Sequence, residues 1–346
     1  MAMVDITVRG AGAFGLSIAW ACARRGARVR VIDPNGPGAG ASGGLVGALA
    51  PHVPENWNAK KAFQFDSLIW AETFWAEVAQ AGGLSPGYGR TGRLQPIADD
   101  RALDLARARA VTAAQLWQGK AVWQVRPVSD FGIWAPHSPT GWLIHDTLTA
   151  RMHPRQACAA LVAALRSAGT EITTDGPDQG QVVHATGAAG LIALSEALGK
   201  PVGNGVKGQA ALLAHDARAL PQIFADGTHI VAHGDGSVAI GSTSERDYAD
   251  ATATDAQLEA VIAKARAAVP ALADAPVIER WAGLRPRAKS RAPMVGPHPL
   301  YPGQFIANGG FKIGFGMAPR IATLMANLLL DGRDAIPPEF LPQASL

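Results

Sequence analysis

The sequence predicts an α/β (α+β) fold of two domains, one built around a parallel sheet and the other around a mainly antiparallel sheet. Three observations lead to this prediction. The chain opens with a strand, a glycine turn, a helix and a second strand over residues 4–33. A buried strand at 182–186 again runs into small residues and a helix start. Two further stretches, 117–142 and 206–240, hold strand-forming runs separated by turns, which indicates a separate sheet.

The first pattern is typical of a Rossmann-like dinucleotide-binding unit. A β-branched run precedes Gly10-x-Gly12-x-x-Gly15, an apolar helical pattern follows, and the second strand ends on Asp33, 18 residues beyond the third glycine. Gly10 permits the tight turn, Gly12 lets backbone N–H groups approach a pyrophosphate, and Gly15 lets helix and strand pack closely. We therefore expect a pyrophosphate at the N-terminus of the first helix and ribose hydroxyls on Asp33. A chance glycine turn would not keep all four features in register.

The segment that follows, Pro34 to Pro51, contains too much glycine and alanine for an ordinary helix or strand. A solvated loop would stay polar, whereas this segment turns apolar at Leu45 and Leu49. We therefore expect a buried segment that approaches the cofactor, with Ser42 offering a hydroxyl, rather than a flexible surface loop.

The remaining elements are predicted from periodicity and from capping signals. Helices are expected over 60–81, over 99–117, from Pro154 to Gly169, after a capping box formed by Thr254 and Gln257, and from Pro319, in the first turn, to Gly332. Strands are expected at 171–174 and 305–308, with a glycine-rich turn over 309–318.

Composition narrows the class of protein. At 346 residues the chain is long enough for two domains, and its 48% hydrophobic content and mean hydropathy of +0.09 are typical of a globular enzyme. The net charge of +3 comes from scattered lysines and arginines, so nothing indicates nucleic-acid binding. No run approaches the roughly 18 apolar residues of a membrane span, and the first strand begins too early for a signal peptide to precede it. We therefore expect a cytoplasmic protein without membrane contact.

Two cysteines, Cys22 and Cys158, both lie in apolar helical patterns, which favours buried thiols over a disulfide or a metal site. The histidines never recur at the spacing of metal ligands, so no metal is expected.

Taken together, five motifs resemble the D-amino-acid-oxidase (DAO) superfamily of FAD enzymes. Within it the chain is most similar to the glycine-oxidase branch, which includes the ThiO-like oxidases of thiamine biosynthesis. The motifs are the fingerprint 10–15 with Asp33, GASGGLVGALAP at 40–51, QVVHATGAA at 181–189, AGLRPRAKSRAPMVG at 282–296 and ANGGFKIGFGMAP at 307–319. Their order along nearly the whole chain is more specific than any one of them.

The resemblance implies a non-covalent FAD and a discontinuous FAD-binding domain. That domain would comprise residues 1–85, 150–205 and 300–346, and the substrate domain residues 86–149 and 206–299. The residues implied in cofactor binding are Gly10, Gly12, Ala13, Phe14, Gly15, Asp33, Pro34, Ala41, Ser42, Gly43, Gly44, Gly47, Ala48, Leu49, Thr186, Gly187, Arg285, Gly310, Phe311, Lys312, Ile313, Gly314, Phe315 and Gly316.

Three residues are implied in catalysis: Arg285, Lys312 and His229. Arg285 matches the family arginine that pairs with the substrate carboxylate, a task for which the planar guanidinium fork is suited. The alternative is that Arg285 belongs to an exposed basic run that continues to Arg291. The family has a second arginine where this chain has Lys312, which cannot make the fork, and a tyrosine where it has His229, whose charge would vary near neutral pH. These departures put glycine itself in doubt as the substrate, while an amine or amino-acid substrate remains the expectation.

The expected reaction is oxidation of a small amine or amino acid, such as glycine, sarcosine or a D-amino acid. Hydride would pass to flavin N5, and O2 would be the electron acceptor, giving an imine and H2O2. Two alternatives remain: a D-amino-acid dehydrogenase with another acceptor, or a flavin-binding subunit that needs a partner for activity. A nicotinamide dehydrogenase is disfavoured by the segment 41–43 and by the C-terminal glycine turn. A homo-oligomer is left open.

Overall fold

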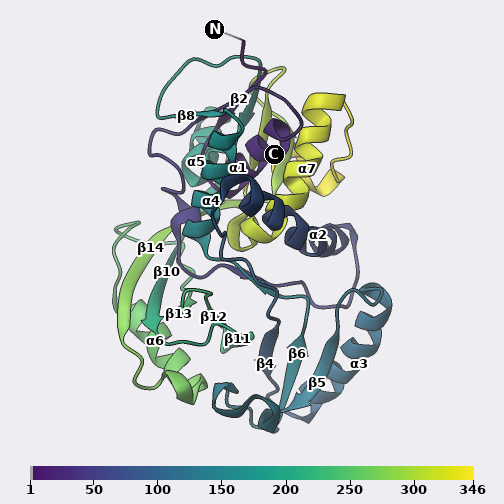
Figure 1. Cartoon of the computed structure of the whole chain (residues 1–346), viewed down its shortest axis with the longest axis vertical. Helices are drawn as coiled ribbons and strands as arrows, with labels where there is room; N and C mark the ends of the chain where they lie inside the picture. The colour runs from purple at the N-terminus through teal and green to yellow at the C-terminus, as the bar shows by residue number, and fades with distance from the viewer. Residues whose placement is uncertain (1–2) are drawn as a thin grey trace.

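Two β-sheets organise the computed structural model, which describes residues 3–346 (Figure 1). The sheet in the upper half of Figure 1 has six strands, in the order β15 (Met294–Pro297), β16 (Phe305–Asn308), β9 (Gln181–His184), β1 (Ile6–Arg9), β2 (Val29–Ile32) and β8 (Glu171–Thr173). All neighbouring strands in this sheet are parallel except β15 and β16.

The sheet in the lower half has eight strands and is largely antiparallel. Their order is β14 (Val277–Ala288), β10 (Gly203–Ala214), β13 (Ser237–Gly241), β12 (Thr228–Ala232), β11 (Gln222–Ala225), β4 (Arg93–Pro96), β6 (Trp142–Asp146) and β5 (Trp123–Pro127). The predicted combination of a parallel and a mainly antiparallel sheet is confirmed.

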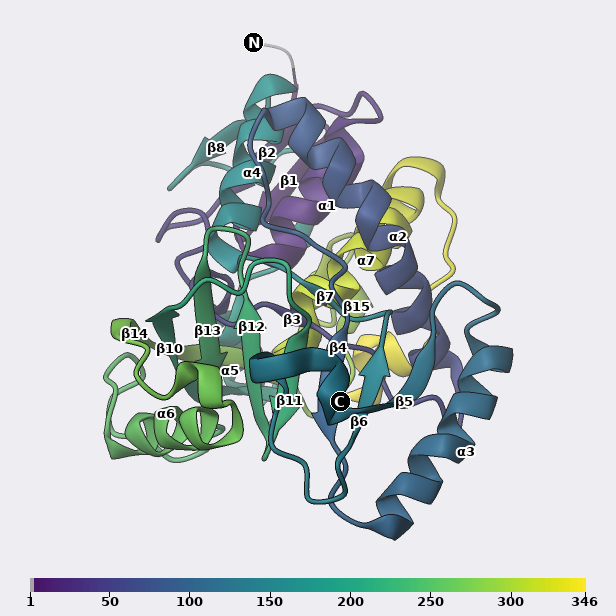
Figure 2. The same cartoon turned by 60° about the horizontal axis from the view of Figure 1, so that its bottom comes forward.

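Helices cover the parallel sheet because its central strands are apolar on both faces. The helices α1 (Ala13–Ala23), α2 (Ala59–Gly82), α4 (Pro154–Ser167) and α7 (Gly314–Asp331) form one large hydrophobic core with β1 and β9, and α5 (Gly187–Ala197) belongs to a smaller cluster with β16. In the antiparallel half, α3 (Asp100–Leu116) packs on β5, and α6 (Ala256–Ala268) packs on β10 and β13 (Figure 2). A two-stranded ladder of β3 (Ala48–Leu49) and β7 (Ala150–Arg151) completes the strands.

The helices predicted at 60–81, at 99–117 and from Pro154 are confirmed, and two details are wrong. Asp255, not Thr254, caps α6, because its carboxylate accepts the Gln257 N–H at 2.9 Å. Pro319 lies inside α7 rather than in its first turn, because Gly314 and Gly316 already have helical backbone and the glycine-rich stretch starts the helix earlier.

Two strands depart from the expected domain boundaries. Strand β10 begins at Gly203, inside the stretch 150–205 expected for the FAD-binding domain, yet it belongs to the eight-stranded sheet. Strand β15 falls in the stretch 206–299, yet it pairs with β16 in the parallel sheet, because the chain passes from β14 through a short turn directly into it. The boundary expected at residue 300 is therefore wrong for this strand.

The segment Phe311–Asp331, which includes α7, reaches the length and mean hydropathy, 1.4, of a membrane span, contrary to the expectation that no stretch approaches one. The helix packs between α1 and α2, and Met317, Ile321 and Met325 are at most 1% exposed. It is therefore a core helix. Both cysteines are free and buried, as predicted.

Candidate cofactor and substrate site

Three helices lead away from neighbouring parallel strands: α1 follows β1, α5 follows β9, and α7 follows β16 after the short 3-10 helix η4 (Phe311–Ile313). Their N-termini therefore meet at the carboxyl edge of the sheet. In none of the three does the side chain of the N-cap residue, Gly12, Thr186 or Ile313, accept a hydrogen bond from the first turn. The other four helices, α2, α3, α4 and α6, are each capped by a side chain. Open N–H groups at the start of a helix attract anions and polar ligands, so the missing caps indicate that a ligand belongs at this edge.

The glycines of the fingerprint serve two purposes. Gly10 has φ +107°, and a Cβ there would lie 2.2 Å from the Ala185 carbonyl oxygen; a Cβ on Gly15 would lie 1.9 Å from the oxygen of Gly10. These two glycines let β1, β9 and α1 pack closely, as predicted for Gly15. At Gly12 the nearest atom to a Cβ would be the hydroxyl oxygen of Ser42, at 3.1 Å. Gly12 therefore faces the ligand side of the turn.

Ser42 and Asp33 both bond to the backbone of this turn. The Ser42 hydroxyl accepts the N–H of Ala13 at 2.9 Å, at the start of α1. One carboxylate oxygen of Asp33 accepts the N–H of Ala11 at 2.7 Å, and the other accepts that of Asn35 at 3.0 Å. Each carboxylate oxygen still has a free lone pair, so Asp33 is oriented by the backbone and can accept further hydrogen bonds from a ribose.

In the glycine-rich segment the close approaches are between backbone and backbone. A Cβ on Gly43 would lie 2.3 Å from the oxygen of Gly38, and one on Gly47 would lie 1.7 Å from the oxygen of Met152. Leu45 is 1% exposed, so the second half of the segment is buried as expected. The glycines therefore allow this segment to fold against α4 and the sheet beside the uncapped helix ends.

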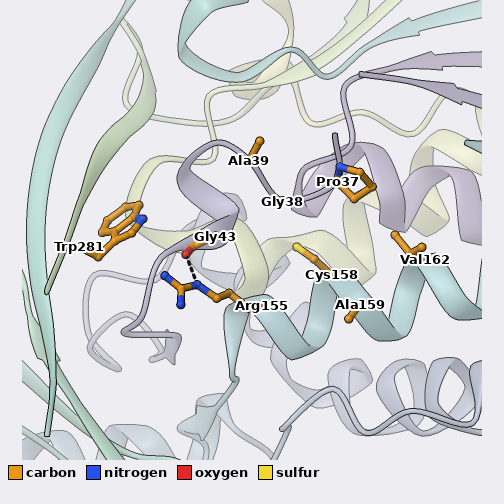
Figure 3. Close-up of a pocket in the computed structure, with 9 residues that line it drawn as sticks. All are labelled: Pro37, Gly38, Ala39, Gly43, Arg155, Cys158, Ala159, Val162 and Trp281. Atoms are coloured by element: carbon orange, nitrogen blue, oxygen red, sulfur yellow. Dashed lines mark hydrogen bonds between the residues drawn. The ribbon is translucent and has the colours of Figure 1, made fainter. Parts of the chain in front are cut away.

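A hollow of about 510 Å³ opens between this segment, α4 and β14 (Figure 3). Its lining includes Arg155, whose Nε donates to the Gly43 oxygen at 2.8 Å and whose guanidinium pairs with Glu279 at 2.6 Å. Trp281 also lines it, as does Cys158, whose pKa burial raises to about 12, so this thiol is no nucleophile at neutral pH. Arg155 and Trp281 could not be identified from sequence patterns, because β14 and α4 are far apart in the chain.

The other predicted cofactor residues gather around the same edge, although not all face a ligand. Pro34 is exposed, whereas Phe14 is 7% exposed and packs under Gly310. The rest lie in or beside η1 (Ala41–Gly43), β3, the start of α5 and the start of α7: Ala41, Gly44, Ala48, Leu49, Thr186, Gly187, Phe311, Lys312, Ile313, Gly314, Phe315 and Gly316.

Arg285 and His229 project from the sheet face that is turned toward the glycine-rich segment. Residues directly opposite each other in antiparallel strands share a face. Arg285 is opposite Val206, and His229 is opposite Gly241, which is opposite Ala210. Ala210 packs with Leu45 of the glycine-rich segment. We call this side the inner face of the eight-stranded sheet; α6 covers the outer face.

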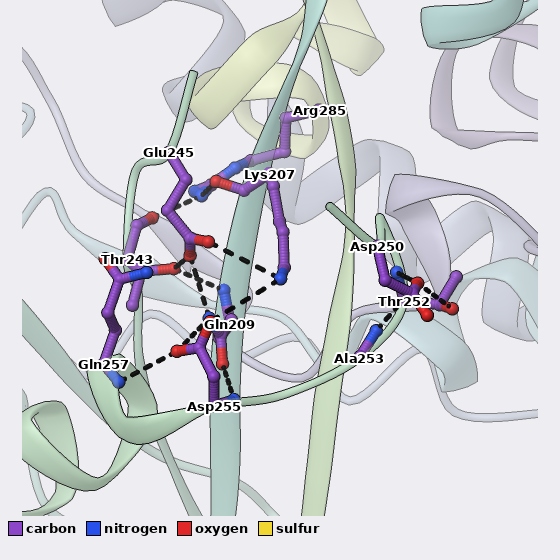
Figure 4. Close-up of polar contacts among 10 residues, drawn as sticks. All are labelled: Lys207, Gln209, Thr243, Glu245, Asp250, Thr252, Ala253, Asp255, Gln257 and Arg285. Carbon is purple, nitrogen blue, oxygen red and sulfur yellow. Dashed lines mark hydrogen bonds and ion pairs between the residues drawn. The ribbon is translucent and has the colours of Figure 1, made fainter. Parts of the chain in front are cut away.

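The guanidinium of Arg285 is held by residues that directly follow β13, and Figure 4 draws it beside Thr243 and Lys207. Its Nη1 donates to the Ser242 hydroxyl at 2.8 Å, and its Nη2 donates to the carbonyl oxygens of Thr243 at 2.5 Å and Lys207 at 3.3 Å. Its Nε is buried and has no partner. Burial lowers the pKa of Arg285 to about 10, against an opposing contribution from Glu245, so the side chain stays charged at neutral pH.

Lys312 and Arg285 both lie over the aromatic ring of Phe311. The ring centroid lies 5.8 Å from the Arg285 guanidinium, 5.6 Å from that of Arg287 and 5.7 Å from the Lys312 ammonium. Burial and the charge of Arg285 lower the pKa of Lys312. Lys289 and Arg291 are exposed, so the alternative of an exposed basic run holds for them and not for Arg285.

His229 lies deep on the inner face beside Phe224, with 4.6 Å between the ring centroids. Its buried Nδ1 has no partner. Burial, assisted by the charges of Arg93 and Lys312, lowers the pKa of His229 to about 3. The expectation that its charge varies near neutral pH is therefore wrong, because burial keeps the imidazole neutral. Arg93, which the sequence did not indicate, is neutralised by Asp146 at 3.0 Å.

The described part of the chain, 3–346, contains no group of three or more His, Cys, Asp or Glu side chains arranged to hold a metal ion. The polar groups that converge here are cations, helix N-termini and a neutral imidazole, which together suit an anionic ligand rather than a cation.

Comparison with known proteins gives a consistent result. The FAD dependent oxidoreductase family (DAO) matches residues 5–328. The chain is 28% identical to a glycine oxidase of Pseudomonas aeruginosa, with 99% of each chain covered. It is 27% identical to the bifunctional protein ThiO/ThiG of a Nostoc species, with 94% of this chain and 53% of that protein covered.

Solved structures share the fold. Glycine oxidase from Geobacillus kaustophilus superposes with a TM-score of 0.82 at 20% identity, covering 97% of each chain. Iminodiacetate oxidase from a Chelativorans species superposes with a TM-score of 0.82 at 24% identity, covering 98% of this chain and 99% of that one.

Proposed function

The chain belongs to the DAO family of FAD-dependent oxidoreductases, and we propose that it oxidises the C–N bond of a small amine or amino acid that carries a carboxylate. The family match confirms the resemblance noted in the motifs, and with it FAD as the cofactor. The proposal for the substrate rests on one observation above all. A half-buried arginine, Arg285, whose buried Nε has no hydrogen-bond partner, lies on the inner sheet face that is turned toward the glycine-rich segment of the cofactor half.

The residues at the edge of the parallel sheet fit FAD. The open N-terminus of α1, with Ser42 beside it, would hold the pyrophosphate, and Asp33 would accept hydrogen bonds from the ribose. The open N-terminus of α7 would stabilise negative charge at the pyrimidine edge of the ring. The bound cofactor supplies the hydride acceptor.

The side chains of the inner face would bind and orient the substrate. Arg285 would hold the carboxylate through its free Nε and an adjacent Nη, exchanging one of its backbone contacts for the ligand. Lys312 would add a second positive charge, and neutral His229 would offer a hydrogen bond through its unpartnered ring nitrogen. Positioning of this kind carries the step, because the substrate reacts as a neutral amine and needs no protein base.

The reaction balances with O2 as the final acceptor. The substrate loses a hydride from the carbon beside nitrogen, a C=N bond forms, and the amine proton leaves to solvent. Water then hydrolyses the imine, and O2 takes up the two electrons with two protons to give H2O2. The names of the relatives, glycine oxidase and iminodiacetate oxidase, support an amine substrate with a carboxylate.

The test is anaerobic reduction of the bound flavin by a panel of glycine, sarcosine, iminodiacetate and D-amino acids, followed by peroxide measurement in air. We expect at least one of them to bleach the flavin and to yield one peroxide per turnover. A holoprotein that dithionite reduces but no amine of the panel bleaches would refute the proposal. Bleaching without peroxide would move the electron acceptor from O2 to another carrier.

A further inference from the structure

Three cationic side chains surround the ring of Phe311: Arg285, Arg287 and Lys312, at 5.8, 5.6 and 5.7 Å from its centroid. We call them the Phe311 cation cluster. Among the described residues none of the three has a carboxylate within 4 Å, although many other arginines of the chain are paired with one, as Arg93 is with Asp146. The cluster is therefore an excess of positive charge without an internal counter-ion.

Such an arrangement is unfavourable unless an anion joins it. Like charges in a partly buried site destabilise one another, and the pKa of Lys312 is lowered partly by the charge of Arg285. The ring of Phe311 offsets some of this cost through its π face, but it carries no net charge. The carboxylate whose charge acts on Arg285, Glu245, is already paired with Lys207 at 3.5 Å and accepts a hydrogen bond from Gln209.

The number of cations without a counter-ion indicates how many carboxylates the cluster can bind. One substrate carboxylate neutralises one of its three cations. The cofactor's pyrophosphate is expected at α1, beside Gly12 and Ser42, and not at Phe311. His229 and His233 are neutral, Arg93 is paired with Asp146, and Glu279 is paired with Arg155, so none of these groups of the inner face changes the count. Two of the three cations remain without a counter-ion after a monocarboxylate has bound.

We propose that the preferred substrate of this site is an amine with two carboxylates. This inference rests on the proposed function and names its substrate class. The first carboxylate binds the deeply placed Arg285, next to the end of β13. The second lies between Lys312 and Arg287, which is two residues farther along β14 and whose backbone forms a bridge to Gly310. The substrate then presents the C–H bond between the two anchors.

Binding is tested with a matched pair of ligands that cannot be oxidised: oxydiacetate, with two carboxylates, and methoxyacetate, with one. Each is titrated into the holoenzyme and followed by the change in flavin absorbance. We expect oxydiacetate to bind at least about tenfold more tightly, the effect of one further charge-assisted contact, and the difference to shrink at high salt. Equal affinities would overturn the proposal.

Variants locate the second carboxylate. In Arg287→Gln and Lys312→Gln the ratio of the two affinities should fall at least fivefold. Lys289→Gln removes the same charge from an exposed position near the end of β14 and should leave the ratio unchanged. A ratio that stays the same in both cluster variants, or that falls equally in the Lys289 control, would refute the assignment.

Turnover separates this inference from the proposed function. Iminodiacetate and sarcosine differ by one carboxylate, and we expect kcat/KM for flavin reduction to be at least tenfold higher for iminodiacetate. If both amines reduce the flavin equally well, the dicarboxylate inference fails and the amine oxidase stands. If no amine reduces the flavin while oxydiacetate still binds selectively, the oxidase proposal fails and the dicarboxylate site stands.

Discussion

The two faces of the strands β10 and β14 differ in whether their buried or half-buried charged side chains are paired. On the outer face Lys207 is 3% exposed, and its ammonium lies 3.5 Å from Glu245 and 3.9 Å from Asp255. Gln209 links the two carboxylates through its side-chain amide, at 3.0 and 2.9 Å (Figure 4). On the inner face Arg285 and Arg287 have no carboxylate partner, and a buried nitrogen of Arg285 has no hydrogen bond at all.

We infer from this difference that the paired charges of the outer face stabilise the fold, whereas the unpaired cations of the inner face bind a ligand. A buried polar group without a partner costs free energy, so a fold retains one only where something else satisfies it. The outer network is internally complete and ties the segment 243–245 to β10 and to the start of α6. On the inner face Arg285 and Arg287 have no such internal partner, which supports the proposal that this face binds an anion. Because Thr243 and Ser242 also hold Arg285, the paired face orients the unpaired one.

The largest effect should come from breaking the outer pair. Lys207→Met would leave Glu245 buried and unpaired, and we expect the free energy of unfolding to fall by about 3–5 kcal/mol in urea titrations. The double variant Lys207→Met, Glu245→Leu should recover most of this loss. Arg287→Met, on the inner face, should lower the free energy of unfolding by less than about 1 kcal/mol, because Arg287 has no carboxylate partner that the substitution would leave unpaired. Equal losses for Lys207 and Arg287 would remove the distinction between the faces.

Next in size is the loss of the guanidinium fork. Arg285→Lys keeps the charge but cannot bind a carboxylate through two parallel hydrogen bonds. We expect kcat/KM for the best amine to fall roughly 30-fold, about 2 kcal/mol, mainly through KM. Stopped-flow flavin reduction measures it, with Lys289→Gln as the charge control. Wild-type kinetics in Arg285→Lys would show that the substrate carboxylate lies elsewhere.

The sequence predicted the half of the site that depends on local patterns. Gly10 to Gly15, the helices that follow the strands and the burial of Leu45 are properties of short windows, because turn geometry and periodicity are set by neighbours in the chain. The role expected for Arg285 came from the resemblance of its surroundings to the family motif, not from a local pattern, and it stays a prediction. The start of α7 was misplaced, because glycine is a poor helix former in isolation and tertiary packing decided its backbone at Gly314.

What the sequence could not predict depends on distant segments. The Phe311 cation cluster requires β14 and η4 to meet, and the outer network requires β10, the segment after β13 and the cap of α6 to converge. The charge state of His229 depends on burial and on the charges of Arg93 and Lys312, which are distant in the chain, so its residue type alone suggested titration near neutral pH. The residue type determines which charge states and contacts a side chain can have, and its burial and neighbours in the fold determine which of them it adopts.

A smaller effect concerns the neutral histidines beside the inner face. His233 is fully buried, and its Nε2 donates to the Leu45 oxygen at 2.8 Å. Burial lowers the pKa of His233 to about 4, below its ordinary 6.5. Between these values the unfolded chain binds the extra proton, so the free energy of unfolding should fall as the pH drops from 6.5 to 4.

Replacing His233 by glutamine, which can still donate to Leu45, should flatten that part of the stability profile. Urea unfolding between pH 4 and pH 7 measures it. The matched control is His137→Gln at an exposed position, which should leave the profile as in the wild type. A wild-type slope in His233→Gln would mean that other groups cause the loss of stability in acid.

The smallest effect extends the comparison from sheet faces to helix ends. Asn58 caps α2 by accepting the Lys61 N–H at 3.0 Å, so Asn58→Ala should lower the free energy of unfolding by about 1 kcal/mol and leave FAD affinity unchanged. Ser42 instead serves α1, whose own N-cap is a glycine. Ser42→Ala should therefore weaken FAD binding about tenfold, measured by flavin fluorescence on titration of the apoprotein, and change apoprotein stability less than Asn58→Ala does. If Ser42→Ala lowers stability and spares FAD affinity, the uncapped end of α1 is not where the cofactor's phosphates bind.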